Sequence, residues 1–257
     1  MDLPMLIILL TSLGVSIYVI ASVISAVGMG SLATAFTSWE FKSALTLSLV
    51  AAFFATILAA PLAISIAYVM ARRRGLLPLV AESLLTLPFT TAPVATGSII
   101  LLFIAQTSLG RWLNSALDLL FTLNGAVLVQ FILALSTMLT PMIEAFKTVD
   151  VEYEHVSRTL GHGFLSTYIS VVIPLARRGL LSSILMGFMK AFSDFGATVM
   201  VAGIIIGRTA TLPGAIYVEM SSGNVNIALA MIILSIIVSF IISLLVRIFR
   251  SGGFERT

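Results

Sequence analysis

The chain has 257 residues, of which 59% are apolar and only 10% are charged. Soluble domains carry roughly 25% charged residues, so this composition excludes a soluble protein and makes the lipid bilayer the solvent. The absence of cysteine excludes disulfide bonds and thiolate metal sites. The formal net charge is +3, and because the basic residues mark membrane topology, we infer no nucleic-acid partner from it.

Six segments are long and apolar enough to cross a membrane, since a spanning helix needs about 20 mostly apolar residues. They cover residues 5–27, 43–70, 82–105, 124–146, 179–206 and 225–249. The first lacks the basic start of a secretory signal peptide and exceeds its usual apolar length, so we interpret it as a retained helix. The predicted fold class is all-α: a polytopic membrane protein with six transmembrane helices and a short cytoplasmic helix, in a single domain over residues 1–257.

The orientation of these segments follows from the basic residues of alternate loops, because the cytoplasmic side carries the excess of Lys and Arg. With the N-terminus inside, the cytoplasmic set is Arg72, Arg73, Arg74, Lys147, Arg158, Arg177, Arg178, Arg247, Arg250 and Arg256. The external set is Lys42, Arg111 and Arg208. This asymmetry predicts a multi-pass protein of the cell membrane with both termini cytoplasmic, and its triple arginine at 72–74 is typical of an anchor at lipid headgroups.

The third apolar segment contains two prolines, Pro88 and Pro93, which remove backbone donors and break a helix. Irregular backbone at membrane depth is tolerated only where it is buried in protein or lines a cavity. The threonines of this region, Thr90, Thr91 and Thr96, are therefore candidates for the lining of a pore. The alternative is a simple kink whose threonines satisfy the freed carbonyl groups.

Two external loops, 106–123 and 207–226, either receive an external partner or close the outer mouth.

Charged residues concentrate in the loop at about 147–178, between the fourth and fifth apolar segments. From residue 151 to 160, apolar or small residues recur at helical spacing, and Gly161 stands where a helix stops. The polar positions between them are Glu152, Glu154, His155 and Arg158. The pattern predicts a short surface helix that meets water or another protein. No third His or Cys accompanies His155 and His162, so no metal site is predicted.

The fifth apolar segment carries two charges four residues apart, Lys190 and Asp194, with Ser193 beside them. On a continuous helix this spacing places both on one face. A lone charge near mid-bilayer costs about 2.5–3.5 kcal/mol, so the two neutralise each other or face a polar interior. One interpretation makes them part of a translocation path, with Lys190 attracting an anion. The other makes them an ion pair that fixes packing.

The loop at 147–178 resembles the EAA loop of ABC importer permeases, in which a short helix and a glycine lead, nine residues later, to an aliphatic-x-aliphatic-Pro exit. Gly161, Val171, Ile173 and Pro174 match this frame. Counting back from Gly161, the family's Glu-Ala-Ala falls on His155, Val156 and Ser157, while Glu154 sits one place earlier. The proline-containing third segment and the run from Lys190 to Thr198 are similar to permeases for molybdate and tungstate, with sulfate and thiosulfate permeases as close relatives.

The resemblance implies a homodimer of six-helix subunits around one path, two cytoplasmic ATPases that hold ATP and Mg, and an external solute-binding protein that delivers a tetrahedral oxyanion. The chain has no phosphate-binding P-loop, so no cofactor is expected on it and no enzymatic activity of its own. The expected coupling residues are Glu152, Glu154, His155, Val156, Ser157, Arg158, Gly161 and Pro174. The expected path residues are Thr90, Thr91, Thr96, Lys190, Ser193 and Asp194.

Two other functions stay open at this point. A secondary transporter would use Lys190 and Asp194 as an ion relay, but it would predict inverted repeats, which the sequence does not show, and would leave the charged loop without a role. A structural subunit of a membrane complex would use both features for packing. A membrane enzyme is disfavoured because no nucleophile and base are paired.

Overall fold

The computed structural model describes residues 36–73 and 75–250, with side chains to residue 248, and a few positions nearer the N-terminus. Those positions are Gly14, Tyr18, Ala21, Ser22, Ser25 and Ala33. The first expected span, 5–27, therefore lies largely outside the described residues. Over the part that is described, the chain is helical and contains no strand.

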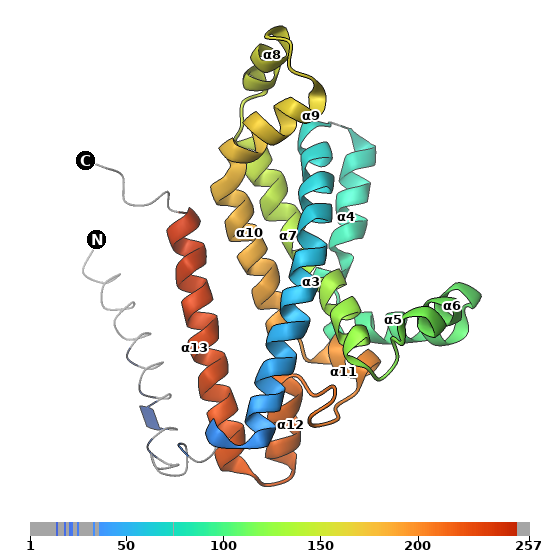
Figure 1. Cartoon of the computed structure of the whole chain (residues 1–257), viewed down its shortest axis with the longest axis vertical. Helices are drawn as coiled ribbons and strands as arrows, with labels where there is room; N and C mark the ends of the chain where they lie inside the picture. The colour runs from blue at the N-terminus through green and yellow to red at the C-terminus, as the bar shows by residue number, and fades with distance from the viewer. Residues whose placement is uncertain are drawn as a thin grey trace.

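Four described helices are long and apolar enough to cross a membrane (Figure 1). They are α3 (Trp39–Arg72), α7 (Leu123–Lys147), the continuous helix Phe164–Ser193 and α13 (Val225–Arg250). The continuous helix comprises α9 (Phe164–Thr167), a π-helical turn (Tyr168–Val172) and α10 (Ile173–Ser193). The segments expected at 43–70, 124–146 and 225–249 are thus confirmed as helices, and each helix is one to four residues longer than predicted at one end or both.

The third expected segment is broken at its prolines. It forms α4 (Leu76–Thr90) and α5 (Pro93–Gln106), whose axes are bent by 106°. Pro93 is the first residue of α5, where a backbone N–H would have no acceptor within the helix, so proline is tolerated there. The backbone of Thr91, just after α4, is extended. In Figure 1, α5 and α6 (Ser108–Leu117) consequently project sideways from the bundle. The prediction of a helix break between residues 88 and 93 is confirmed.

The fifth expected segment, 179–206, is not one helix, which corrects the prediction. α10 ends at Ser193, Asp194 is extended, and a new short helix, α11, runs over Gly196–Ala202. A loop then leads to α12 (Leu212–Ser221), which precedes α13. Two of the expected spans therefore break within the apolar part of the chain.

The core of the bundle is formed by α3, α7 and α10. The face of α3 that packs inward is rich in alanine, with Ala51, Ala55, Ala59 and Ala63 fully buried. Small side chains let helix backbones approach closely in a membrane, where the hydrophobic effect does not drive helix association. The same device recurs in α10, where a Cβ on Gly187 would lie 2.1 Å from Cε of Met138 on α7. In Figure 1 the helix α8 (Val151–Thr159) lies at one end of this bundle and α12 at the other.

Candidate functional site: a surface helix and two broken spans

The short helix predicted at 151–160 is present as α8, Val151–Thr159. The Asp150 carboxylate accepts a hydrogen bond from the Glu152 N–H at 3.0 Å, which satisfies a free donor of the first turn. At the other end, Gly161 has a φ of +92°, and the His162 N–H donates to the Ser157 carbonyl at 3.2 Å. Such closure of a helix end through a positive φ favours glycine. The predicted role of Gly161 as the stop signal is confirmed.

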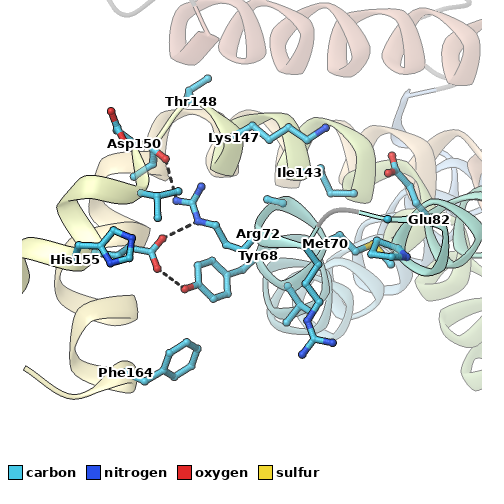
Figure 2. Close-up of a pocket in the computed structure, with 18 of the residues that line it drawn as sticks. Tyr68, Met70, Arg72, Glu82, Ile143, Lys147, Thr148, Asp150, His155 and Phe164 are labelled. Carbon is cyan, nitrogen blue, oxygen red and sulfur yellow. Dashed lines mark hydrogen bonds and ion pairs between the residues drawn. The ribbon is translucent and has the colours of Figure 1, made fainter. Parts of the chain in front are cut away.

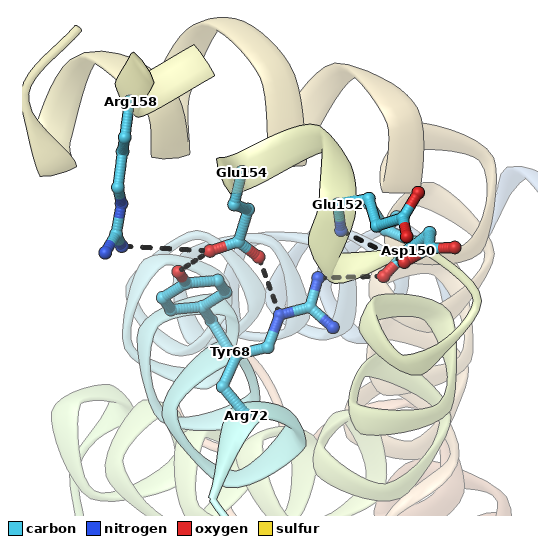
Figure 3. A network of polar contacts seen from close by, with 7 residues as sticks. Tyr68, Arg72, Asp150, Glu152, Glu154 and Arg158 are labelled. Atoms are coloured by element: carbon cyan, nitrogen blue, oxygen red, sulfur yellow. Dashed lines mark hydrogen bonds and ion pairs between the residues drawn. The ribbon is translucent and has the colours of Figure 1, made fainter. Parts of the chain in front are cut away.

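Glu154 points from α8 into the bundle, as Figure 3 shows, and only 4% of the residue is exposed. Its Oε2 accepts a hydrogen bond from the Tyr68 hydroxyl at 2.7 Å, and its Oε1 pairs with Arg72 Nε at 2.7 Å. Arg72 also donates through Nη2 to the Val149 carbonyl at 2.9 Å. The Arg158 guanidinium lies farther off, 4.0 Å from Oε2. The last turn of α3 thus holds both oxygens of one carboxylate on α8.

A second polar contact and a group of aromatic rings support the same face of α8. The Ser157 and Thr167 hydroxyls lie 2.9 Å apart, and both residues are buried. Below them, the ring of Tyr68 packs against Phe146 and Tyr168, with centroids 5.6 and 4.7 Å apart. The inward face of α8 is therefore polar and anchored, and it rests on an aromatic layer contributed by α3, α7 and the π-helical turn.

The exposed side of α8 carries apolar side chains among its polar ones. Tyr153, Val156 and Leu160 have 56%, 57% and 75% of their surface exposed. They recur three and four residues apart, so they form one stripe along the helix. This stripe borders a shallow hollow of about 510 Å³ that also reaches Glu152 and His162. A surface helix of a soluble protein has the reverse polarity, with its apolar stripe toward the core.

The structure shows on which side of α8 each position of the Glu-Ala-Ala frame lies. His155 and Val156 are exposed, whereas Ser157 and Glu154 are buried. Glu152 and Arg158 are exposed as well. The expected coupling residues are therefore divided between an anchoring face and a free face, a division that the sequence alone did not reveal.

Pro174 follows the π-helical turn without ending the helix. The Ile173 N–H bonds to the Tyr168 carbonyl five residues back, and the helix continues to Ser193. A π-helical turn accommodates a local change in hydrogen bonding inside an α-helix. Proline in this position therefore costs less than inside a regular helix, where it removes an i to i−4 bond.

A cleft of about 1140 Å³ opens beside α8, between the end of α3, the start of α4 and the end of α7 (Figure 2). Glu82, Lys147, His155 and Phe164 are among its lining residues, and the Tyr68 and Arg72 contacts to Glu154 lie in its wall. Basic and acidic groups are mixed along this wall. The cleft therefore has no single sign of charge that would select an anion or a cation.

The two broken spans lie against each other. A Cβ added to Gly97 of α5 would lie 2.6 Å from Cα of Ala197 in α11, so only glycine allows this approach. A Cβ added to Gly196 would lie 2.9 Å from Cγ2 of Val94. The Lys190 Nζ stands 5.9 Å from the centroid of the Phe89 ring, in the range of a cation–π contact. The structure thus brings together the third and fifth expected segments at their breaks.

Lys190 and Asp194 do not form the ion pair that one of the two interpretations expected. Among the described residues no ion pair joins them, because α10 ends at Ser193 and Asp194 leaves the helix in an extended conformation. Asp194 Oδ2 instead accepts hydrogen bonds from Thr198 N at 2.8 Å and Thr198 Oγ1 at 2.7 Å. Asp194 is 4% exposed and holds the first turn of α11. The spacing rule for helix faces failed here because the helix does not continue.

The other expected path residues occupy different environments. Thr90 and Ser193 are exposed in the single chain, while Thr91 is partly buried. Thr96 is buried, with 7% exposed, and Thr90 Oγ1 donates to the Leu87 carbonyl.

Sequence reasoning missed Gln130 of α7, which is fully buried with its Nε2 3.5 Å from Thr198 Oγ1. A glutamine within an apolar segment was the available signal. Over the described residues no cluster of His, Cys, Asp and Glu could hold a metal ion.

An all-helical membrane bundle with two broken spans and a projecting helix between α7 and α10 has the fold of an ABC importer permease. The fold resembles a solved bacterial ABC transporter involved in the import of the acidic polysaccharide alginate, with a TM-score of 0.65 and 13% identity. That match covers 87% of this chain and 84% of the other. By sequence, the chain belongs to the family described as binding-protein-dependent transport system inner membrane component, which it matches over residues 59–252.

Several relatives have assigned names. The probable transport system permease protein NifC of Clostridium pasteurianum is 30% identical over 78% of this chain and 70% of its own length. The molybdenum transport system permease protein ModB of Haemophilus influenzae is 28% identical over 83% of this chain and 95% of its own length. ModB of Mycobacterium bovis is 31% identical, with 81% and 79% covered. The chain is therefore a permease of the molybdate and sulfate group of ABC importers, rather than a secondary transporter or a structural subunit.

Proposed function

We propose that this chain forms the path by which a tetrahedral oxyanion, molybdate or tungstate, enters the cell, and that a separate cytoplasmic ATPase drives it through α8. The observation that carries the coupling assignment is the polarity of α8. Its buried residues are the polar Glu154 and Ser157, while an apolar stripe of Tyr153, Val156 and Leu160 is exposed beside Glu152 and Arg158. An exposed apolar stripe on a charged helix is typical of an interaction site.

The substrate class rests on the relatives and on the chemistry near the breaks. Relatives named for molybdenum transport are 28–31% identical to this chain, and one named for sulfate transport is 31% identical. Lys190 supplies a positive charge beside the break in the third segment, and Thr90 and Ser193 supply exposed hydroxyls. Hydroxyl groups exchange hydrogen bonds with a passing oxyanion, and a path must release what it admits.

A second copy of the chain completes the path in this proposal. No residue of α4 is buried in the single chain, and the backbone between Thr90 and Pro93 is irregular. In a membrane such backbone is covered by protein or lines a cavity, because lipid cannot satisfy its polar groups. Paired copies would cover α4 on one side and leave Thr90 and Thr91 facing the axis. Two copies of α8 would then receive two ATPase subunits, which hold ATP and Mg.

An external solute-binding protein is the remaining partner, and the loops 106–123 and 207–226 are its proposed docking surface. Tyr217 and Met220 of α12 are 58% and 50% exposed. α12 lies at the end of the bundle opposite α8 in Figure 1. With α8 in the cytoplasm, this end faces outward, as the distribution of Lys and Arg predicts.

The deciding experiment is uptake into proteoliposomes that contain this permease with its ATPase and binding protein. Molybdate, tungstate, sulfate and phosphate are compared at equal concentration, with a complex that cannot hydrolyse ATP as the control. We expect ATP-dependent uptake of molybdate or tungstate. Preferred uptake of sulfate or phosphate would refute the assignment of molybdate or tungstate as the substrate. Calorimetry of the permease alone with molybdate should reveal no nanomolar site, because the lining is weakly polar.

A further inference from the structure

Glu154 joins α8 to a span that α8 does not connect in sequence. α8 lies between α7 and the helix that begins at Phe164, so movement of α8 reaches those two helices through short peptide links. The Ser157 contact is equally local, since Thr167 is ten residues away. Tyr68 and Arg72, by contrast, are 86 and 82 residues from Glu154 and belong to the last turn of α3.

α3 carries this connection to the opposite end of the molecule. Its 34 residues extend about 51 Å at 1.5 Å per residue, which exceeds the hydrocarbon thickness of a bilayer. Near its first turns, the Ser48 hydroxyl accepts a hydrogen bond from the backbone N–H of Leu212, the first residue of α12. The ring of Trp39 occupies the space beside Gly207, where a Cβ would lie 2.2 Å from it. α3 thus contacts α8 at one end and the loop 203–211 with α12 at the other.

The hydrogen bonds of Glu154 fix both the distance and the orientation of α3 relative to α8. Two donors from one helix hold two different oxygens of the carboxylate, so the side chain cannot rotate about a single hydrogen bond (Figure 3). The group is buried, where charged hydrogen bonds are less screened than at the surface. A glutamine in its place can accept from Arg72 with its oxygen and donate to the Tyr68 oxygen with its N–H₂, but both contacts then lose the negative charge that strengthens them.

We propose that Glu154 is a positioning residue that makes α3 move with α8, so that ATP-driven movement at the cytoplasmic end reaches α12 at the external end. This inference rests on the proposed function, because it takes α8 as the element that the ATPase moves. It assigns the transmission to one carboxylate and its two partners, Tyr68 and Arg72.

The test compares Glu154→Gln with Glu144→Gln in the reconstituted complex of permease, ATPase and binding protein. Both changes remove one negative charge near the end of the bundle that carries α8, but Glu144 of α7 is exposed and its carboxylate pairs with Lys147 of the same helix. We expect Glu154→Gln to retain the co-purified ATPase and its basal ATP hydrolysis, and to lower the anion transported per ATP by about tenfold, a typical size for coupling between sites. Glu144→Gln should leave this ratio unchanged. An unchanged ratio in Glu154→Gln would overturn the proposal.

A second variant decides the matter if Glu154→Gln fails to assemble. Tyr68→Phe keeps the ring between Phe146 and Tyr168 and removes only the hydroxyl that donates to Glu154. It should lower the transport ratio in the same direction, by several-fold, and normal coupling in this variant would overturn the proposal. Val156→Asp, at an exposed position of α8, tests separately whether α8 docks to the ATPase. If Val156→Asp still co-purifies with the ATPase, the docking assignment fails, whatever the Glu154 variants show.

Discussion

The two hydrogen bonds that Asp194 accepts from Thr198 lead to a prediction that separates the observed contacts from the pair expected of a continuous helix. Asp194→Ala removes two hydrogen bonds between its carboxylate and Thr198, and it leaves a buried backbone N–H without a partner. Hydrogen bonds to charged groups contribute roughly 1.5–3 kcal/mol, and a buried donor left without a partner costs about 1–3 kcal/mol. We expect the free energy of unfolding to fall by about 2–3 kcal/mol, since the two losses overlap.

Double-mutant cycles show which residue interacts with Asp194 and so accounts for the lost stability. The permease is unfolded reversibly in mixed micelles, and Asp194→Ala is combined with Thr198→Val in one cycle and with Lys190→Met in the other. The first cycle should show a coupling of about 1–3 kcal/mol, and the second should be additive within about 0.5 kcal/mol. A strong coupling between Lys190 and Asp194, with additivity between Asp194 and Thr198, would refute the described geometry.

Three further predictions concern the crossing of the broken spans, the end of α8 and the path. Gly97→Leu should cost about 1–3 kcal/mol in the same unfolding measurement, because even its Cβ would lie 2.6 Å from the Ala197 backbone. Gly163→Leu, whose Cβ would meet nothing within 4 Å, is the matched control, and equal stabilities of the two variants would contradict the prediction. Gly161→Pro requires a φ near −65° in place of +92°, so uptake per ATP should fall while hydrolysis persists; unchanged coupling would count against α8 as the coupling element. Lys190→Met should slow molybdate uptake roughly fivefold, the effect of about 1 kcal/mol of charge attraction, whereas Lys190→Arg should retain most of it.

The long spans were predictable because the bilayer constrains them strongly. α3, α7 and α13 each contain an apolar run of about 20 residues or more, and a backbone in lipid must satisfy its own hydrogen bonds. The break in the third segment was also predictable, since Pro93 cannot continue a helix. The break at Asp194 was not predicted, because no proline marks it. An aspartate directly before an apolar run is nevertheless a helix-start signal, and the apolar residues on both sides of Asp194 masked it.

The helix α8 and its stop at Gly161 were likewise predictable from local pattern. The direction in which Glu154 points was not, because its partners lie 82 and 86 residues earlier in the chain. The local periodicity of a sequence predicts which residues share a helix face. It does not predict which other helix packs against that face. Tyr68 and Arg72 lie one helical turn apart at the end of an apolar run. They can be recognised as the partners of Glu154 only once α3 and α8 are placed side by side.

The apolar stripe on α8 has a consequence for how such a protein is made in the cell. A permease synthesised without its ATPase displays Tyr153, Val156 and Leu160 to water, on a helix held rigidly in place. Exposed apolar surface of this kind promotes aggregation and capture by chaperones and proteases. We therefore expect the abundance of the membrane subunit to follow the supply of its ATPase, so that unassembled copies are degraded and the two subunits accumulate in a fixed ratio.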